Sequence, residues 1–150
     1  MSCSIGSGRG TFLWPLLDAL PELPVTAIDE SEVRARDLGA VARGGVARLT
    51  AVRASVLTLP FTEASFDVVT MLEVLEHLHA PAIAAREIVR VARRFVVVSV
   101  PSKEDDNPEH VQLFNDASLT QLFHEAGGER IARVRTEHVR GHIVGVVTLS

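Results

Sequence analysis

Apolar positions along the chain fall into two kinds of segment, which alternate. Short runs rich in β-branched residues span 25–28, 66–71 and 95–100. Each run is almost continuously apolar, which is typical of strands covered on both faces. Between the runs lie stretches with helical spacing. The clearest, at 81–92, begins with a proline suited to a first helical turn and carries one apolar stripe. The pattern predicts strands that alternate with helices.

The last third of the chain follows a different pattern. Residues 116–119 open a predicted helix that ends at Gly127 and Gly128. Two β-rich segments follow, 130–139 and 143–149, with a break at Gly141. We therefore expect an α/β fold, with a mostly parallel sheet, an antiparallel C-terminal strand pair and helices on both faces. No repeat or linker divides the chain, so residues 1–150 are predicted to form a single domain.

Composition narrows the class of protein. Hydrophobic residues make up 47% of the chain and charged residues 23%, as expected of a folded domain. The net charge of -4 disfavours a nucleic-acid partner, although the arginines at 34, 36, 43, 48 and 53 form either a local patch or a solvated helix face. The lone Cys3 excludes an internal disulfide, and no apolar run resembles a membrane span or a signal peptide. We expect a cytoplasmic protein with no membrane partner.

A glycine-rich loop, 5–10, separates the first strand residues from a helix expected to begin near Thr11. Gly6, Gly8 and Gly10 occupy its alternate positions, which allows a sharp turn and a close approach to a ligand. A dinucleotide fingerprint places its third glycine at the sixth position, where this chain has Thr11. The spacing therefore suits a ligand without a pyrophosphate. The alternative interpretation is a tight turn with no ligand.

Asp29 strengthens the ligand interpretation. It ends the second apolar strand, about 20 residues beyond the loop, where an acid would accept hydrogen bonds from both ribose hydroxyls. Asp29 could instead cap the helix that follows, but Ser31 is equally able to do so. The loop and the acid together favour an adenosine-containing ligand.

Five segments in the expected order resemble the class I S-adenosylmethionine-dependent methyltransferases. They are 5–10, 27–31, 59–61, 65–69 and 73–78, and 86–91 is similar to the small-molecule branch of that family. The resemblance implies a Rossmann-like fold and an enzyme that transfers a methyl group from S-adenosylmethionine to an acceptor, expected to be a small molecule. The acceptor itself is not identified.

The resemblance also implies a set of cofactor-binding residues. These are Ser4, Ile5, Gly6, Ser7, Gly8, Gly10, Asp29, Glu30, Ser55, Val56, Met71, Leu72 and Glu73. The family usually has acids where this chain has Ser4 and often has Asp at the position of Ser55. Hydroxyls can still form hydrogen bonds there, so we expect weaker cofactor binding rather than its loss.

The segment before the glycine loop is shorter than in the family. Three explanations stay open: the start is truncated, a partner subunit such as a second copy in a homodimer covers the cofactor, or the site is open.

Glu73, Glu76 and His77 are spaced so that a helical turn would bring them to one face. His110 could add a fourth ligand for a divalent metal such as Mg²⁺. The set resembles the metal site of methyltransferases acting on quinone precursors or RNA 3′ ends. Alternatively, Glu73 lines the cofactor pocket while Glu76 and His77 stabilise the turn.

Methyl transfer needs mainly alignment, but a hydroxyl acceptor also needs a base, for which His77 and His110 are the candidates. Two other classes of function are alternatives. An NAD-dependent oxidoreductase is disfavoured by the glycine spacing and by the absence of tyrosine. A non-catalytic cofactor-binding module is the remaining alternative. Replacing Asp29 with alanine is expected to weaken cofactor binding while leaving the fold intact.

Overall fold

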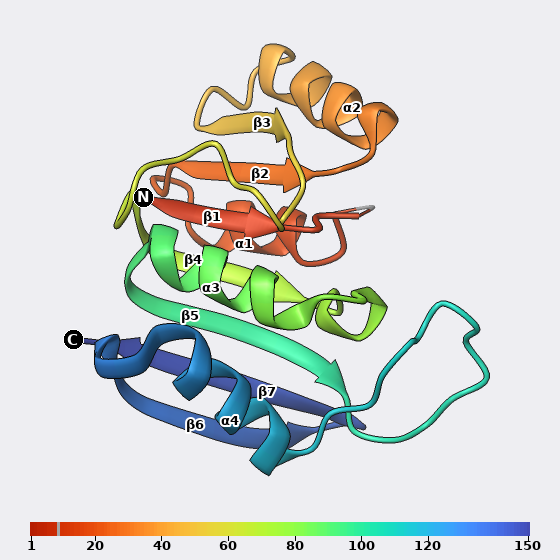
Figure 1. The fold of residues 1–150 in the computed structure, drawn as a ribbon. Helices are drawn as coiled ribbons and strands as arrows, with labels where there is room; N and C mark the ends of the chain where they lie inside the picture. Colours follow the sequence, from red (N-terminus) through yellow and green to blue (C-terminus); the bar gives the residue numbers. More distant parts are fainter. Residues whose placement is uncertain (9) are drawn as a thin grey trace.

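The computed structural model describes residues 1–8 and 10–150, so Arg9 of the glycine loop lies outside the described residues. Within them, one sheet has the strand order β3-β2-β1-β4-β5-β7-β6 (Figure 1). The strands are β1 Ser2–Ile5, β2 Val25–Asp29, β3 Leu49–Arg53, β4 Phe66–Leu72, β5 Ala92–Pro101, β6 Ile131–Val139 and β7 His142–Leu149. The helices are α1 Leu13–Ala19, α2 Glu32–Arg43, α3 Pro81–Val91 and α4 Asp116–Gly127, with short 3₁₀ turns η1 Leu75–His77 and η2 Gly128–Arg130.

The pairing of the strands confirms the predicted mixed sheet. β1 to β5 pair in parallel, whereas β7 runs antiparallel to both β5 and β6. From β1 the chain winds outward to β2 and β3, then returns to add β4 on the other side of β1. The strand order therefore reverses between β1 and β4. In open α/β sheets, ligands bind at the carboxyl ends of the strands beside such a reversal.

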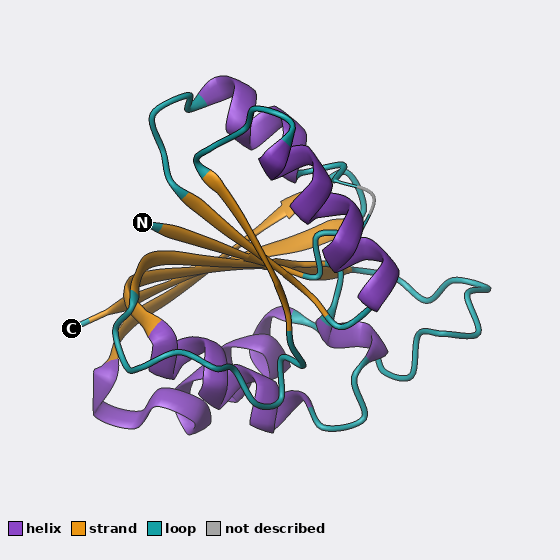
Figure 2. Ribbon diagram, turned by 90° about the horizontal axis from the view of Figure 1, so that it is seen from above, coloured by secondary structure: helices purple, strands orange, loops and turns teal. Residues whose placement is uncertain are grey.

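Helices cover both faces of the sheet, as predicted (Figure 2). On one face, leucines of α1 and α2 form a small core against β2 and β3. On the other face, α3 and α4 contribute to a larger core that reaches across the sheet from β2 to β6. Neighbouring residues of β2 show the alternation, because Ala27 belongs to the smaller core and Ile28 to the larger.

Local signals in the sequence explain where the helices begin and end. Ser31 caps α2 by accepting a hydrogen bond from the Arg34 amide at 3.4 Å. The cap of α4 is Asn115, one residue before the predicted start, and Ser118 completes a reciprocal capping box. α1 begins at Leu13, two residues after the expected position. None of the described helices is long and apolar enough to cross a bilayer.

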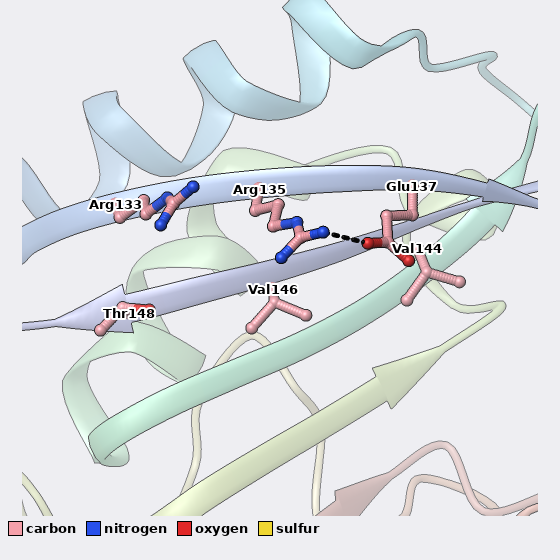
Figure 3. A pocket seen from close by; sticks show the side chains of 6 residues that line it. All are labelled: Arg133, Arg135, Glu137, Val144, Val146 and Thr148. Carbon is pink, nitrogen blue, oxygen red and sulfur yellow. Dashed lines mark hydrogen bonds and ion pairs between the residues drawn. The ribbon is translucent and has the colours of Figure 1, made fainter.

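The face of the sheet that α1 covers extends across β5, β7 and β6. The side chains on that part of the face belong to neither core. Val97, Val144 and Val146 are half-buried there. Figure 3 shows the two β7 valines on one face with Arg135 and Glu137 of β6, which form an ion pair at 2.6 Å. This apolar strip leads from the edge of the molecule toward the carboxyl end of β5.

Candidate active site

The three glycines of the loop have the backbone conformations that the sequence predicted. Gly6, Gly8 and Gly10 have φ values of +67°, +53° and +81°, in the region that favours glycine. The Gly6 amide donates to the Ile28 carbonyl at 2.9 Å, which ties the loop to β2. A Cβ atom on Gly6 would lie 2.4 Å from Cγ2 of Val74. Glycine is therefore required at position 6, both because φ is positive and because the Val74 side chain leaves no room for a Cβ atom.

The other two glycines have different surroundings. A Cβ atom on Gly10 would lie 2.1 Å from the indole nitrogen of Trp14, so Gly10 allows the loop to pack on α1. At Gly8 the nearest atom to an added Cβ is the Gly6 carbonyl oxygen, at 3.8 Å. Gly8 therefore borders open space, where a ligand could approach the backbone.

Asp29 lies beside this loop at the end of β2 and is 5% exposed. Its Oδ1 accepts a hydrogen bond from the Ser31 amide at 2.9 Å, and its Oδ2 accepts one from the Gly8 amide at 3.2 Å. Arg34 approaches Oδ2 at 3.9 Å. Ser31 caps α2, as the sequence suggested, but Asp29 also orders the loop. An ionised carboxylate has about four acceptor positions, which leaves room for further donors.

A cavity of about 580 Å³ opens between this carboxylate and the segment after β3. Ala54, Val56 and Leu78 supply apolar walls, while Asp29 and Glu30 supply carboxylates. The cavity thus combines flat apolar surface with acceptors for hydroxyl groups. This arrangement fits a nucleoside, whose base is flat and whose sugar carries hydroxyls.

Two of the predicted cofactor residues lie elsewhere. Ser55 is not in the lining of this cavity, and its hydroxyl accepts from the Leu57 amide at 3.3 Å. Met71 is fully buried in the larger core. Sequence position placed both near the strand ends but could not give the direction of their side chains.

A second cavity, of about 840 Å³, lies on the other side of the glycine loop. Ser4, Ser7 and Leu72 line it together with the start of α1. Val97 and Val144 continue its wall into the apolar strip on the open face of the sheet. The residues that border both cavities are Ile5, Gly6, Gly8 and Glu73.

Glu73 departs from the predicted helical face. It has φ +56°, and its amide donates to the Ser99 carbonyl at 3.0 Å, so it still belongs to the edge of the sheet. Its carboxylate accepts from the Ser99 hydroxyl at 2.6 Å and lies 3.1 Å from Nδ1 of His142. The expectation that Glu73 joins Glu76 and His77 on one helix face is wrong, because the turn is a 3₁₀ turn that begins only at Leu75.

Glu76, His77 and His110 do come together. One ligand atom from each lies within 4.8 Å of the others. Glu76 is 1% exposed, and neither of its carboxylate oxygens forms a hydrogen bond with a described residue. Burial raises the pKa of the Glu76 carboxyl above its ordinary value, and the charge of Glu73 adds to this effect. The predicted metal cluster therefore keeps three of its four members.

His77 and His110 have partners that hold their rings. Nδ1 of His77 lies 3.0 Å from the Glu109 carbonyl, and Nδ1 of His110 lies 2.9 Å from Asp105. His77 lines the smaller cavity, whereas neither ring lines the larger one. Cys3 is fully buried, and burial raises the pKa of its thiol to about 12, so it is no nucleophile.

Comparisons with known proteins identify the family of the chain. A model of the methyltransferase domain family matches residues 3–97. A probable S-adenosylmethionine-dependent methyltransferase, found in two strains of Mycobacterium tuberculosis, is 33% identical over 69% of this chain. The match covers 40% of that protein, so the chain spans about two fifths of the length of these relatives.

Solved structures share the fold. The 1,6-didemethyltoxoflavin-N1-methyltransferase of Burkholderia thailandensis, with bound S-adenosylhomocysteine, has a TM-score of 0.80 and 22% identity over 99% of this chain and 70% of its own. A SAM-dependent methyltransferase from Aquifex aeolicus has a TM-score of 0.78 and 20% identity over 99% and 81%. By sequence and by fold, the chain belongs to the methyltransferase domain family and is of the class I S-adenosylmethionine-dependent type.

Proposed function

We propose that this domain binds S-adenosylmethionine in the smaller cavity and transfers its methyl group to an acceptor in the larger one. The observation that carries the proposal is the position of the glycine loop and Glu73, which border both cavities. A ligand that enters the smaller cavity therefore reaches the larger one at its far end. Family membership supports the choice of cofactor.

Several residues of the smaller cavity have distinct roles in cofactor binding. Asp29 accepts hydrogen bonds from the ribose hydroxyls with its remaining lone pairs. Val56 and Leu78 contact the adenine ring, and Gly8 lets the ligand approach the backbone. When bound, the cofactor supplies a methyl group already activated by a positively charged sulfur. Leu72 and Val97 give the larger cavity an apolar wall, and alignment of the acceptor there governs the rate.

Calorimetric titration with S-adenosylmethionine tests the cofactor, and NAD is the negative control. We expect Asp29→Ala to weaken the affinity at least tenfold, since each hydrogen bond to a charged group contributes about 1.5–3 kcal/mol. Ser31→Ala is the matched control, because it removes the cap of α2 without touching the cavity. Equal affinity of Asp29→Ala and the wild type would contradict the assigned role of Asp29.

Transfer is tested separately from binding. Labelled cofactor is incubated with the protein and a pool of small metabolites, and labelled products are separated. Binding without any transfer would point to the alternative of a non-catalytic module. The small-molecule acceptor, the cytoplasmic location and a homodimer stay predictions.

A metal-assisted reaction is a second candidate because of the buried Glu76. A carboxylate without a hydrogen-bond partner needs either a proton or a cation. Two imidazoles and one carboxylate fit a metal, and imidazole ligands favour Zn²⁺ or Fe²⁺ over the Mg²⁺ expected from the sequence. A bound ion would fix the segment that carries His110 against the smaller cavity.

Thermal unfolding with added metal tests this second candidate. We expect Zn²⁺ to raise the melting temperature more than Mg²⁺ does, and the His110→Ala variant to lose the difference. His124→Ala is the control, since His124 lies on α4 outside the cluster. Equal melting temperatures with and without each metal would leave the turn with a purely structural role.

A further inference from the structure

His142 and Glu73 lie together in the larger cavity, and His142 has no part in cofactor binding as proposed above. Nδ1 of His142 lies 3.1 Å from the Glu73 carboxylate, which also accepts the Ser99 hydroxyl at 2.6 Å. His142 is the first residue of β7, and its pairing with Pro101 of β5 brings it beside the end of β4. Ser99 lies on β5 and His142 on β7, while Glu73 directly follows β4, so the three side chains meet at the carboxyl edge of the parallel strands.

Nδ1 is the ring nitrogen of His142 that faces the Glu73 carboxylate, at 3.1 Å. A carboxylate accepts hydrogen bonds, so the neutral ring that best matches this ion pair has its proton on Nδ1. The neutral ring then has its lone pair on Nε2. Among the described residues, Nε2 forms no hydrogen bond. One Glu73 oxygen accepts the Ser99 hydroxyl and the other pairs with the His142 ring, so the carboxylate is held between the two side chains.

The surroundings of His142 determine which kind of acceptor could approach Nε2. The side chain is half-exposed and borders the larger cavity. The lining of that cavity includes the apolar Leu13, Val97 and Val144 as well as polar residues such as Ser7, Thr11 and Arg140. At about 840 Å³ the cavity is of the size that holds small molecules. Its wall continues through Val144 onto the face shown in Figure 3, where Val146 lies beside the Arg135–Glu137 ion pair. An acceptor with a flat apolar body and one protic group suits this space.

We propose that His142 is the general base for a weakly acidic hydroxyl, phenolic or enolic, on a largely apolar acceptor, and that Glu73 is its positioning residue. The proposal rests on the proposed methyl transfer. Nε2 removes the hydroxyl proton while the oxygen forms a bond to the methyl carbon. The carbon–sulfur bond breaks, its electron pair stays on sulfur, and the products are a methyl ether and S-adenosylhomocysteine. The imidazolium beside Glu73 then releases its proton to water.

The other histidines are placed differently. His77 and His110 belong to the cluster around Glu76 and do not line the larger cavity. His138 pairs with Asp116 at 2.8 Å, but this pair lies outside both cavities. His138 is therefore a matched control: it has the same kind of carboxylate partner and no access to the acceptor.

The first test uses the protein without any ligand. Nitrogen NMR of the histidine rings, assigned with His142→Gln, reports which nitrogen of His142 carries the proton. We expect the Nδ1–H form in the wild type and a mixture of both forms in Glu73→Ala. A ring protonated on Nε2 in the wild type would overturn the proposal, since no lone pair would then face the cavity.

The second test uses 7-hydroxycoumarin, whose absorbance shows whether its phenolic hydroxyl is ionised. We expect bound probe to be ionised at a pH where free probe is neutral, and this ionisation to be lost in His142→Ala and kept in His138→Ala. Methylation of the probe is expected to fall about a hundredfold in His142→Ala, as for loss of a general base.

The outcomes separate the two proposals. If His142→Ala keeps its affinity for the cofactor but no longer ionises the probe, the role of His142 as general base is supported. If the cofactor binds but ionisation of the probe does not depend on His142, the proposal that His142 is the general base is overturned. The methyltransferase proposal is unaffected by that result. Absence of cofactor binding in the wild type overturns the proposed function, whereas the form of the His142 ring is still read from the ligand-free spectra.

Discussion

At the scale of single residues, positive φ values and close contacts impose separate demands on the glycines. Gly6 and Gly141 both have positive φ, at +67° and +88°. A Cβ atom would collide with Val74 at Gly6, whereas nothing lies within 4 Å of one at Gly141. A pair of variants can therefore separate backbone strain from steric exclusion at the cofactor loop.

We expect Gly6→Ala to lower the free energy of unfolding by about 2–4 kcal/mol, combining left-handed strain with overpacking. Gly141→Ala is expected to cost about 1 kcal/mol, from strain alone. Urea unfolding measures both values. Similar losses in the two variants would show that Val74 moves aside without cost.

Asp29 shows why a residue's role could be predicted more easily than its surroundings. Its distance from the glycine loop in the sequence indicated a ribose-binding acid. The sequence did not indicate that the Gly8 and Ser31 amides both donate to it. Asp29→Ala leaves those two donors without their partner, so we now expect a loss of stability alongside the loss of affinity, rather than an intact fold.

At the scale of elements, α3 holds the segment between β3 and β4 in place. Arg90 donates to the carbonyls of Phe61 at 2.6 Å and Leu59 at 3.0 Å, and Glu87 accepts the Leu59 amide at 2.8 Å. Arg90 and Glu87 are themselves joined at 2.7 Å. This segment carries Val56, so the helix indirectly supports a wall of the smaller cavity.

We expect Arg90→Ala to lower the free energy of unfolding by about 1–3 kcal/mol, because two carbonyls lose their donor. Arg86→Ala, an exposed arginine one turn earlier on the same helix, is the control. The hydrogen bond from Arg90 lowers the pKa of Glu87, so its stabilising effect is complete above the ordinary pKa of glutamate and is lost as the pH falls through the lowered value. The difference between wild type and Arg90→Ala should therefore shrink in acid. A constant difference from neutral pH into acid would contradict this role of Glu87.

Periodicity predicted the elements well, since a strand covered on both faces needs a continuous apolar run. Periodicity could not predict contacts between strands that are far apart in the sequence. Glu73 and His142 are neighbours only because β7 turns back along β5, and spacing along the chain carries no sign of this. The predicted helical face of Glu73 was wrong for a related reason: its amide bonds to β5, which keeps the residue in the sheet and delays the turn.

At the scale of the whole molecule, the reversal of strand order between β1 and β4 creates the site. Both cavities lie at the carboxyl edge of the sheet, and Glu73, directly after β4, borders each of them. A ligand in this position contacts segments that follow β1, β2, β3 and β4. Binding therefore ties together parts of the chain that the two cores stabilise separately.

Cofactor binding should consequently stabilise the entire fold. At a concentration a hundred times its Kd, a ligand that binds only the folded state adds about 2.7 kcal/mol. For a chain of 150 residues this corresponds to a rise in melting temperature of roughly 5–10 °C. We expect S-adenosylhomocysteine to produce this rise in differential scanning fluorimetry, NAD at the same concentration to produce none, and Asp29→Ala to reduce it. If calorimetry showed S-adenosylhomocysteine binding without a rise in melting temperature, the unfolded chain would also bind this ligand. The binding site would then not require the folded arrangement around Glu73.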